Sequence, residues 1–306
     1  MPIKNNQIIF IVGPTGVGKS DVGLLLAQHI GGEIIACDAM QVYKEIAIAS
    51  DKPTVEQRSA VAHHCLDLVS VTEDFNVAQY AKAALAAIAD VRKRGKVPIL
   101  LGGSGMYMAV LLDGIFEDNI KDNELRESLE HEAKADGAAL HERLTQLDPQ
   151  SAANIHPNNV KRVIRALEVV MLTGQPLSAM QQKRSGLWGK EDVKIFGLNR
   201  PREILYERVD ARVDRMFAQG LVDEIKKVIE LPLSVTAAGM IGVVQVGGYL
   251  NEQYSLDHAV TIMKRDTRHY VKRQLTWFNR EKRLQWIEIG PKDTPQSIVN
   301  QIIGQL

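Results

Sequence analysis

A phosphate-binding motif stands near the start of the chain. Residues 13–20 fit the pattern G-x-x-x-x-G-K-[ST], in which glycines let successive backbone N–H groups turn toward phosphate oxygens. Lys19 adds a positive charge, and the hydroxyl of Ser20 is a ligand for Mg²⁺, the predicted cofactor. The predicted diphosphate- or nucleotide-binding residues are Gly13, Pro14, Thr15, Gly16, Val17, Gly18, Lys19 and Ser20. The motif does not say which phosphate compound is bound.

Two more polar loops follow apolar stretches and are expected at the same crevice. In an open parallel sheet the ligand lies beyond the carboxyl ends of the strands, so residues directly after each strand are candidates. Asp38 follows one such stretch and is suited to act as a general base, as a Mg²⁺ ligand through water, or only as a turn cap. Ser104, in a Gly-Gly-Ser-Gly loop, is either a helix N-cap or part of the pocket wall.

A balanced total charge hides two segments of opposite sign. The chain has 37 Lys+Arg and 37 Asp+Glu, which at face value argues against a nucleic-acid partner. Residues 113–136 contain nine acids and three bases, and residues 264–283 contain eight bases and two acids. In the basic segment, Arg265, Arg268 and Lys272 share one helical face. Four rings able to stack on bases stand nearby: His269, Tyr270, Trp277 and Phe278. Residues such as the last two are more often core residues than stacking platforms.

Two other basic groups occur on predicted helices. Lys161, Arg162 and Arg165 lie on a helix with an apolar face. Arg208, Arg212 and Arg215 form a stripe on the helix after Pro201. The sequence leaves two interpretations of this stripe: Asp210 and Asp214 neutralise it, or some of the arginines turn toward the phosphate site.

Composition and length indicate an ordinary globular protein. With 306 residues, 45% hydrophobic and 24% charged, the chain is neither disordered nor fibrous, and one domain with an insertion or two unequal domains is expected. The longest apolar run, 106–112, is far short of the roughly 20 residues that cross a bilayer. The first residues lack the features of a signal peptide, so a cytoplasmic protein with no membrane partner is expected. Cys37 and Cys65, the two cysteines, are expected to be reduced.

The periodicity predicts an α/β fold with a parallel sheet flanked by helices. Short apolar runs predict strands at 8–12, 33–37, 97–101, 193–198 and 284–289. Helices are predicted at 19–30, 77–94, after Pro201, at 255–278 and at the end of the chain. Residues 113–192 show helical periodicity alone, which predicts a helical insertion domain. The predicted core is therefore discontinuous, 1–112 and 193–306.

With these motifs in order, the chain resembles the tRNA dimethylallyltransferase family, also called tRNA isopentenyltransferases, in its bacterial form without a zinc finger. The resemblance covers nearly the whole sequence, and the order and spacing of the motifs are highly specific. The segments that resemble the family are 13–20, 38–43, Lys52-Pro53, His63-His64, 102–107, 156–158, Arg162, 165–169, 212–216, Gly220-Leu221 and 267–277.

The resemblance implies an enzyme that transfers a dimethylallyl group from its diphosphate to N6 of adenosine 37 in tRNAs reading codons that start with U. It also implies a P-loop NTPase-like core, an all-helical insertion that grips the anticodon stem-loop, a monomer, and Mg²⁺ with the diphosphate. Catalytic roles fall to Lys19, Ser20, Asp38 as the base and Arg212 as a diphosphate ligand. Predicted tRNA contacts, including the basic helix, are Asp38, Ala39, Met40, Gln41, Ser104, Arg126, Lys161, Arg162, Val163, Ile164, Arg165, Arg268, Lys272 and Arg273.

The chain departs from the family pattern in three places. Ala39 replaces a usual serine, Ala49-Ser50-Asp51 replaces Gly-Thr-Ala, and Val243-Val244 replaces a tyrosine and a basic residue. We expect these changes to leave the diphosphate site intact and to bear on the details of RNA contact and on the set of tRNAs that is recognised.

Three other functions fit parts of the pattern. A small-molecule P-loop kinase or NTPase would bind ATP tightly, and an RNA-binding module would have a vestigial phosphate loop. A relative that prenylates free adenine nucleotides would not need the helical insertion or the basic helix.

Overall fold

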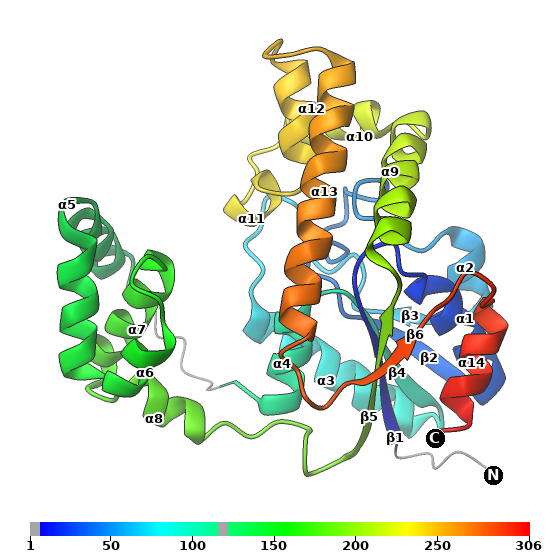
Figure 1. Cartoon of the computed structure of the whole chain (residues 1–306), viewed down its shortest axis with the longest axis horizontal. Helices are drawn as coiled ribbons and strands as arrows, with labels where there is room; N and C mark the ends of the chain where they lie inside the picture. The colour runs from blue at the N-terminus through cyan, green and yellow to red at the C-terminus, as the bar shows by residue number, and fades with distance from the viewer. Residues whose placement is uncertain (1–6, 116–121) are drawn as a thin grey trace. The chain divides into compact units, whose positions relative to one another are not determined.

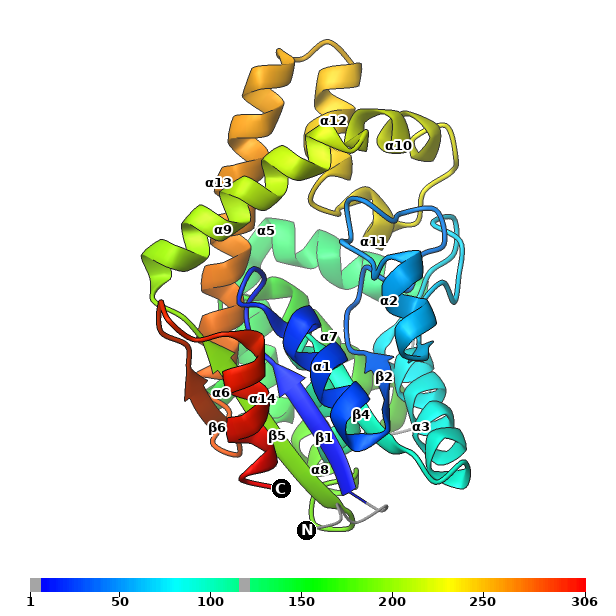
Figure 2. The same cartoon turned by 90° about the vertical axis from the view of Figure 1, so that its right-hand side faces the viewer.

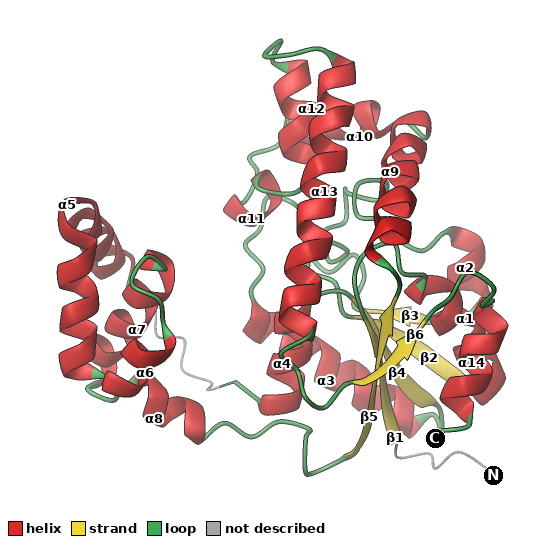
Figure 3. Ribbon diagram, in the orientation of Figure 1, coloured by secondary structure: helices red, strands yellow, loops and turns green. Residues whose placement is uncertain are grey.

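A six-stranded parallel sheet forms the centre of the larger of two compact units. The computed structural model describes residues 7–115 and 122–306; part of the acidic stretch, 116–121, and the first six residues lie outside this description. The strands are β1 (Gln7–Val12), β2 (Gly32–Ala36), β3 (His63–His64), β4 (Val97–Gly102), β5 (Asp192–Asn199) and β6 (Gln285–Glu288). Their order is β3-β2-β4-β1-β5-β6, and every neighbouring pair is parallel (Figures 1 and 3).

Helices cover both faces of this sheet, and others stand beyond the carboxyl ends of its strands. In the larger unit they are α1 (Lys19–Ile30), α2 (Val55–Ala60), α3 (Val77–Lys93), α4 (Gly105–Asp113), α9 (Arg202–Ala218), α10 (Leu221–Val228), α11 (Val235–Ala238), α12 (Val243–Leu250), α13 (Leu256–Phe278) and α14 (Pro295–Ile303). Helices α1 and α14 pack on one face, where Leu26 and Ile302 meet Ile9 of β1 in one apolar core. Helix α3 covers the other face (Figure 1). This is the predicted α/β fold class, a parallel sheet flanked by helices.

Helices α9, α10 and α12 stand beyond the carboxyl ends of the strands, and α13 begins there and runs down to the level of the sheet, where Val271 joins its core (Figure 2). Two ion pairs join α9 to α13: Asp210 with Arg268 and Asp214 with Lys264, both at 2.6 Å. The long helix α13 therefore rests on α9 at the edge of the sheet where a ligand is expected.

The predicted strands and helices are present with small shifts at their ends. β2 begins at Gly32 and ends at Ala36, one residue earlier than predicted at each end. The predicted cap Asn76 accepts hydrogen bonds from the N–H groups of Ala78 and Gln79. Strand β3 was not predicted, since a pair of histidines has no periodicity to detect. Among the described residues, no helix combines the length and apolarity needed to cross a membrane.

The smaller compact unit, Leu112–Gly186, is helical in its described residues. Its helices are α5 (Asn123–Leu147), α6 (Pro149–Asn154), α7 (Val160–Thr173) and α8 (Leu177–Gln182). Their apolar faces share a core to which Leu129, Leu144 and Leu167 contribute. Residues after Gly186 belong to the larger unit, so the compact helical unit ends before the predicted boundary at residue 192.

A buried carboxylate fixes two arginines inside this helical unit. Glu168 of α7 is fully buried and accepts hydrogen bonds from Arg126 at 2.7 and 3.0 Å and from Arg165 at 2.7 Å. Burial alone would raise the pKa of Glu168, but the two guanidinium groups outweigh it and hold that pKa below its ordinary value. The ionised form is therefore the one that folding favours.

We predict that Glu168→Gln destabilises the helical unit by about 2 kcal/mol. This is less than the roughly 3–5 kcal/mol of a fully buried pair, because both arginines are partly exposed and keep some hydration. The stabilisation by Glu168 is complete above the unfolded-state pKa and is lost as the pH falls through the lower folded-state pKa. Urea unfolding between pH 7 and pH 3 measures both effects.

Glu132→Gln is the matched control, since it removes the same charge from an exposed pair with Arg143 at 3.4 Å. Equal losses of stability in the two variants would contradict the special role of Glu168.

Candidate functional site

The phosphate loop joins β1 to α1, as the motif predicts. Gly13 has a φ of 149°, and a Cβ there would lie 2.5 Å from the carbonyl oxygen of Leu198 in the neighbouring β5. Gly18 has a φ of 104° at the start of α1. Both residues need to be glycine because their backbone is left-handed, and Gly13 also lies too close to β5 for a side chain. The loop therefore presents its N–H groups at the positive end of α1.

Lys19 folds back over the loop. Its ammonium group donates hydrogen bonds to the carbonyl oxygens of Gly13 and Pro14, both at 2.9 Å. Desolvation is the main cause that lowers the pKa of Lys19 to about 8; the charge of Asp38 opposes this shift and that of Arg212 adds to it. The lysine thus has an ammonium group that a phosphate anion would stabilise in its charged form.

Two further arginines hold the loop from outside. Arg200 donates to the carbonyl oxygen of Val17 at 3.0 Å, and Arg208 donates to that of Gly16 at 2.6 Å. Burial lowers the pKa of Arg200, and the nearby charge of Arg208 adds to this shift. Arg200 was missed in the sequence, although it directly follows β5, so the rule that selected Asp38 would have found it.

The arginine stripe of α9 turns toward the phosphate loop. Arg212 forms an ion pair with Asp51 at 3.2 Å, and Arg208 and Arg215 line the same open basin as Lys19. Asp210 and Asp214 pair with α13 instead, as described above. Of the two interpretations of this stripe, the structure therefore supports the second.

Asp38 lies at the carboxyl end of β2, and its loop is tied to that of Ser104. One carboxylate oxygen of Asp38 accepts the N–H of Met40 at 2.9 Å, so the side chain caps its own turn. The same residue lines the cavity that Thr15 and Arg212 also line. The hydroxyl of Ser104 accepts the N–H of Ala39 at 3.0 Å. Asp38 therefore caps its turn and faces the ligand space at the same time.

Gln274 of α13 connects the phosphate loop to the Gly-rich loop after β4. Its side-chain oxygen accepts the N–H of Thr15 at 2.8 Å, and its side-chain nitrogen donates to the carbonyl oxygen of Gly103 at 3.0 Å. Gln274 is 5% exposed. Sequence reasoning included Gln274 in a motif but gave it no role, because both of its partners are backbone groups of distant loops.

Three adjoining cavities meet at Arg212. The first, of about 210 Å³, places Asp38, Thr15 and Tyr270 beside apolar side chains. Its apolar lining is Met40, Ala49, Val213, Met216, Met240, Ile241 and Met263. The second is a small pocket of about 80 Å³ lined by Lys19, Ser20 and Asp38. The third is an open basin of about 590 Å³ beside Gly16 and Lys19. A polar, cationic space thus continues into an apolar one.

The residues of this region fit a magnesium ion shared with a phosphate ligand. Within 7–115 and 122–306, no group of three or more His, Cys, Asp or Glu side chains could hold a metal. Mg²⁺ is commonly bound by one or two carboxylates together with substrate phosphates, so such a cluster is not required. Ser20, Asp38 and Asp51 line one pocket and supply a hydroxyl and two carboxylates.

The neighbouring thiol is chemically inert. Cys37 is buried directly before Asp38, and burial raises the pKa of its thiol to about 12. Burial likewise raises the pKa of Tyr270 to about 12, so its hydroxyl stays protonated. Neither group supplies an anionic nucleophile near neutral pH.

The basic helix α13 is only partly available to a ligand. Arg268 is engaged by Asp210 of α9, whereas Lys272 and Arg273 are exposed. Arg273 lies 5.5 Å from the centroid of the Tyr270 ring and lines the first cavity. Of the candidate stacking rings, Phe278 is fully buried and is a core residue.

Trp277 also has a packing role. A Cβ on Gly105 would lie 2.3 Å from its ring, so Trp277 packs directly on the loop after β4. The core interpretation, left open by the sequence, is therefore supported for Phe278, whereas Trp277 is partly exposed and packs against Gly105.

The predicted RNA-contacting residues of the helical unit divide into three groups. Lys161 and Arg162 are exposed at the start of α7. Val163 and Ile164 are 1% and 4% exposed and pack in the core of the unit, so their side chains do not offer an RNA surface. The remaining two, Arg126 and Arg165, bind Glu168.

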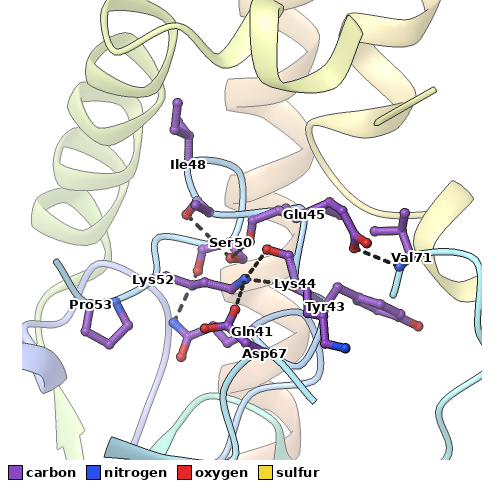
Figure 4. A network of polar contacts seen from close by, with 12 residues as sticks. Gln41, Tyr43, Lys44, Glu45, Ile48, Ser50, Lys52, Pro53, Asp67 and Val71 are labelled. Atoms are coloured by element: carbon purple, nitrogen blue, oxygen red, sulfur yellow. Dashed lines mark hydrogen bonds and ion pairs between the residues drawn. The ribbon is translucent and has the colours of Figure 1, made fainter. Parts of the chain in front are cut away.

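The loop between β2 and α2 is held by polar contacts of its own (Figure 4). Lys52 is almost fully buried and donates to the backbone oxygens of Tyr43 and Lys44 and to Asp67, the last at 2.6 Å. Gln41 donates to the carbonyl oxygens of Ser50 and Asp51, both at 3.2 Å. These contacts fix the backbone that presents Asp51 to Arg212.

The chain matches one family model and is similar to named enzymes over nearly its whole length. A family model described as IPP transferase matches residues 41–281. The tRNA dimethylallyltransferase of Geobacter metallireducens is 40% identical over 304 residues, which cover 98% of each chain. The enzyme of that name from Thermotoga maritima is 40% identical over 289 residues, 94% of each chain.

Solved structures with similar folds have related descriptions. A tRNA isopentenylpyrophosphate transferase from Bacillus halodurans is 35% identical with a TM-score of 0.71, and the match covers 98% of this chain and 96% of that one. A eukaryotic dimethylallyltransferase acting on tRNA is 28% identical with a TM-score of 0.83, and the match covers 98% of this chain and 80% of that one.

We predict that Gln274→Glu destabilises the larger unit by about 2 kcal/mol. The carboxylate keeps an acceptor for the N–H of Thr15 but loses the donor to Gly103, which leaves a buried carbonyl without its partner. Urea unfolding measures the loss. Gln301→Glu, the same change at an exposed site on α14, serves as the control, and an equal stability of both variants would refute the bridging role of Gln274.

Proposed function

The chain belongs to the tRNA dimethylallyltransferase (IPP transferase) family, and from this membership we propose that it transfers a dimethylallyl group from dimethylallyl diphosphate to N6 of adenosine 37 in tRNA. The accepted tRNAs are those that read codons starting with U, and the products are N6-(dimethylallyl)adenosine and diphosphate. The enzyme is a prenyltransferase that alkylates a base amine.

One observation supports this proposal most directly. The cavity of about 210 Å³ joins the phosphate loop, Asp38 and Arg212 to an apolar wall with four methionines. A phosphoryl-transfer site needs a polar space for its acceptor, whereas a prenyl diphosphate needs cations at one end and apolar surface at the other. Methionine side chains adapt well to a branched five-carbon group.

The chemistry assigns a role to each group. The amine nitrogen forms a bond to C1 of the dimethylallyl group, the C1–O bond breaks, and the diphosphate leaves with the electron pair. Lys19 and Arg212 stabilise the negative charge on the leaving group, together with the N–H groups of the loop. Asp38 accepts the proton released from N6.

The pocket lined by Ser20, Asp38 and Asp51 would hold a magnesium ion beside the diphosphate. Ser20 would supply a hydroxyl ligand, and the two carboxylates line the same pocket. Bound Mg²⁺ would neutralise part of the diphosphate charge and so lower the cost of separating the leaving group from the allylic carbon.

A tRNA acceptor fits the distribution of basic side chains. Lys272 and Arg273 of α13 and Lys161 and Arg162 of α7 are exposed. Phosphate contacts of this kind provide affinity without reading sequence. Turning the adenine out of an unpaired anticodon loop costs only a few kcal/mol, so a base can reach Asp38. Because tRNA is the substrate, we place the reaction in the cytoplasm.

The family relationship favours this function over a kinase or NTPase and over transfer to free nucleotides. The decisive assay incubates the protein with unmodified tRNA, labelled dimethylallyl diphosphate and Mg²⁺, with AMP as a competing acceptor. Label is expected in tRNA. Label in AMP alone would identify a nucleotide prenyltransferase, and no transfer would reject the proposal.

We predict that Asp38→Asn keeps tRNA affinity within about twofold but lowers turnover by a factor of about 10² to 10⁴, the usual contribution of a general base. Asparagine retains an oxygen for the Met40 N–H, so the turn is preserved. Binding by filter retention and single-turnover rates separate the two effects. A variant with normal turnover would exclude Asp38 as the base.

We also predict that tRNA affinity falls steeply with salt, with a log-log slope of several units. Replacing Lys161 and Arg162 together with alanine should reduce the magnitude of this slope by about 1.5 to 2, because each phosphate contact contributes somewhat less than one unit. Titrations between 50 mM and 300 mM salt measure the slope. The matched control replaces the exposed Lys82 and Lys93 of α3, and an equal change there would contradict a local RNA surface on α7.

A further inference from the structure

Glu224 makes three hydrogen bonds to consecutive backbone groups of another segment. Its carboxylate accepts the N–H groups of Ala47, Ile48 and Ala49 at 2.8, 2.8 and 2.9 Å. Successive N–H groups that converge in this way form a concave anion site, here filled by a side chain of the same protein. Hydrogen bonds to an ionised acceptor are about twice as strong as neutral ones. Glu224 therefore fixes the path of residues 47–49.

The segment held by Glu224 leads directly into the cavity wall. Ala49 and Ser50 line the first cavity, and Asp51 pairs with Arg212 at 3.2 Å. Asp51 has a φ of 50°, which is the left-handed conformation. This conformation is costly for a residue other than glycine and persists only where the surrounding structure imposes it.

Glu224 also links this segment to the helix that bears Arg212. Helix α10, which contains Glu224 in its first turn, follows α9 after Gly220, whose φ is 95°. Glu224 itself lines a separate hollow behind the segment, together with Glu45 and Ile48, and it lines none of the three cavities at the site. It can therefore affect a ligand only through the residues that it holds.

We propose that Glu224 is a positioning residue for the diphosphate site: it holds residues 47–51 against α9–α10, so that Asp51 fixes the guanidinium group of Arg212. The inference rests on the proposed function in that it takes a diphosphate as the ligand. Lys52 and Gln41 hold the same loop through separate contacts (Figure 4), so loss of Glu224 should shift residues 47–51 without releasing the whole loop.

The test measures binding of inorganic pyrophosphate with Mg²⁺ by calorimetry, which does not depend on prenyl transfer. Glu224→Ala is expected to weaken this binding about tenfold, and Glu224→Gln by a smaller factor, since the amide keeps one acceptor. Asp223→Asn, which neutralises the exposed neighbouring carboxylate, should bind like the unaltered protein. Thermal melting establishes that each variant is folded, and Glu224→Gln replaces Glu224→Ala in the test if the latter is not.

A double-mutant cycle with Asp51→Ala separates positioning from general stability. If Glu224 acts through Asp51, its removal should have less than a threefold effect on pyrophosphate binding in the Asp51→Ala background. In the transfer assay, Glu224→Ala should raise the KM for dimethylallyl diphosphate and leave tRNA affinity unchanged. Additive effects in the cycle, or unchanged pyrophosphate affinity in both Glu224 variants, would overturn the inference. Failure of prenyl transfer in the unaltered protein would instead reject the proposed function and leave the pyrophosphate test valid.

Discussion

The order of strands in the sheet is the constraint on which the site depends. With β2, β4, β1 and β5 adjacent and parallel, their carboxyl ends lie side by side. The next residues are then Asp38, the Gly-rich loop after β4, the phosphate loop and Arg200. The fit is tight: a Cβ on Gly102 would lie 2.0 Å from the carbonyl oxygen of Cys37. Groups far apart in the chain therefore meet because each of them stands within a few residues of the end of a strand.

Backbone groups are the main targets of the side chains that hold this site. Arg200 and Arg208 donate to carbonyls of the phosphate loop, Gln274 bridges two loops, and Glu224 accepts three N–H groups. Loops that bind phosphate through their own N–H groups must stay in one conformation to do so. Side chains from α9, α10 and α13 impose that conformation, which explains why these helices stand at the carboxyl edge of the sheet.

Sequence patterns predicted the elements and the local motifs well. The phosphate loop, the strands and the long α13 each have a signal within a few residues, such as the glycine spacing or the helical period. The two-residue strand β3 has no such signal. The roles of Gln274 and Glu224 were not predictable either, because a hydrogen bond to a distant backbone group leaves no residue-type pattern. Arg126 and Arg165 were assigned to RNA from the family resemblance, and their shared contact with Glu168 could not be predicted because it forms only when the helices pack.

The balanced charge of the chain has a structural meaning. Several bases of α13 are neutralised at short range, Lys264 and Arg268 by α9 and Arg265 by its neighbour Asp266. The two pairs with α9 hold the helix in place, while Lys272 and Arg273, one turn further along, stay exposed. The same helix therefore has bases held in ion pairs and, further along, exposed bases beside the buried residues Gln274 and Phe278. Charge at a site depends on which partners folding supplies, so a net charge of zero is compatible with a local surface for a polyanion.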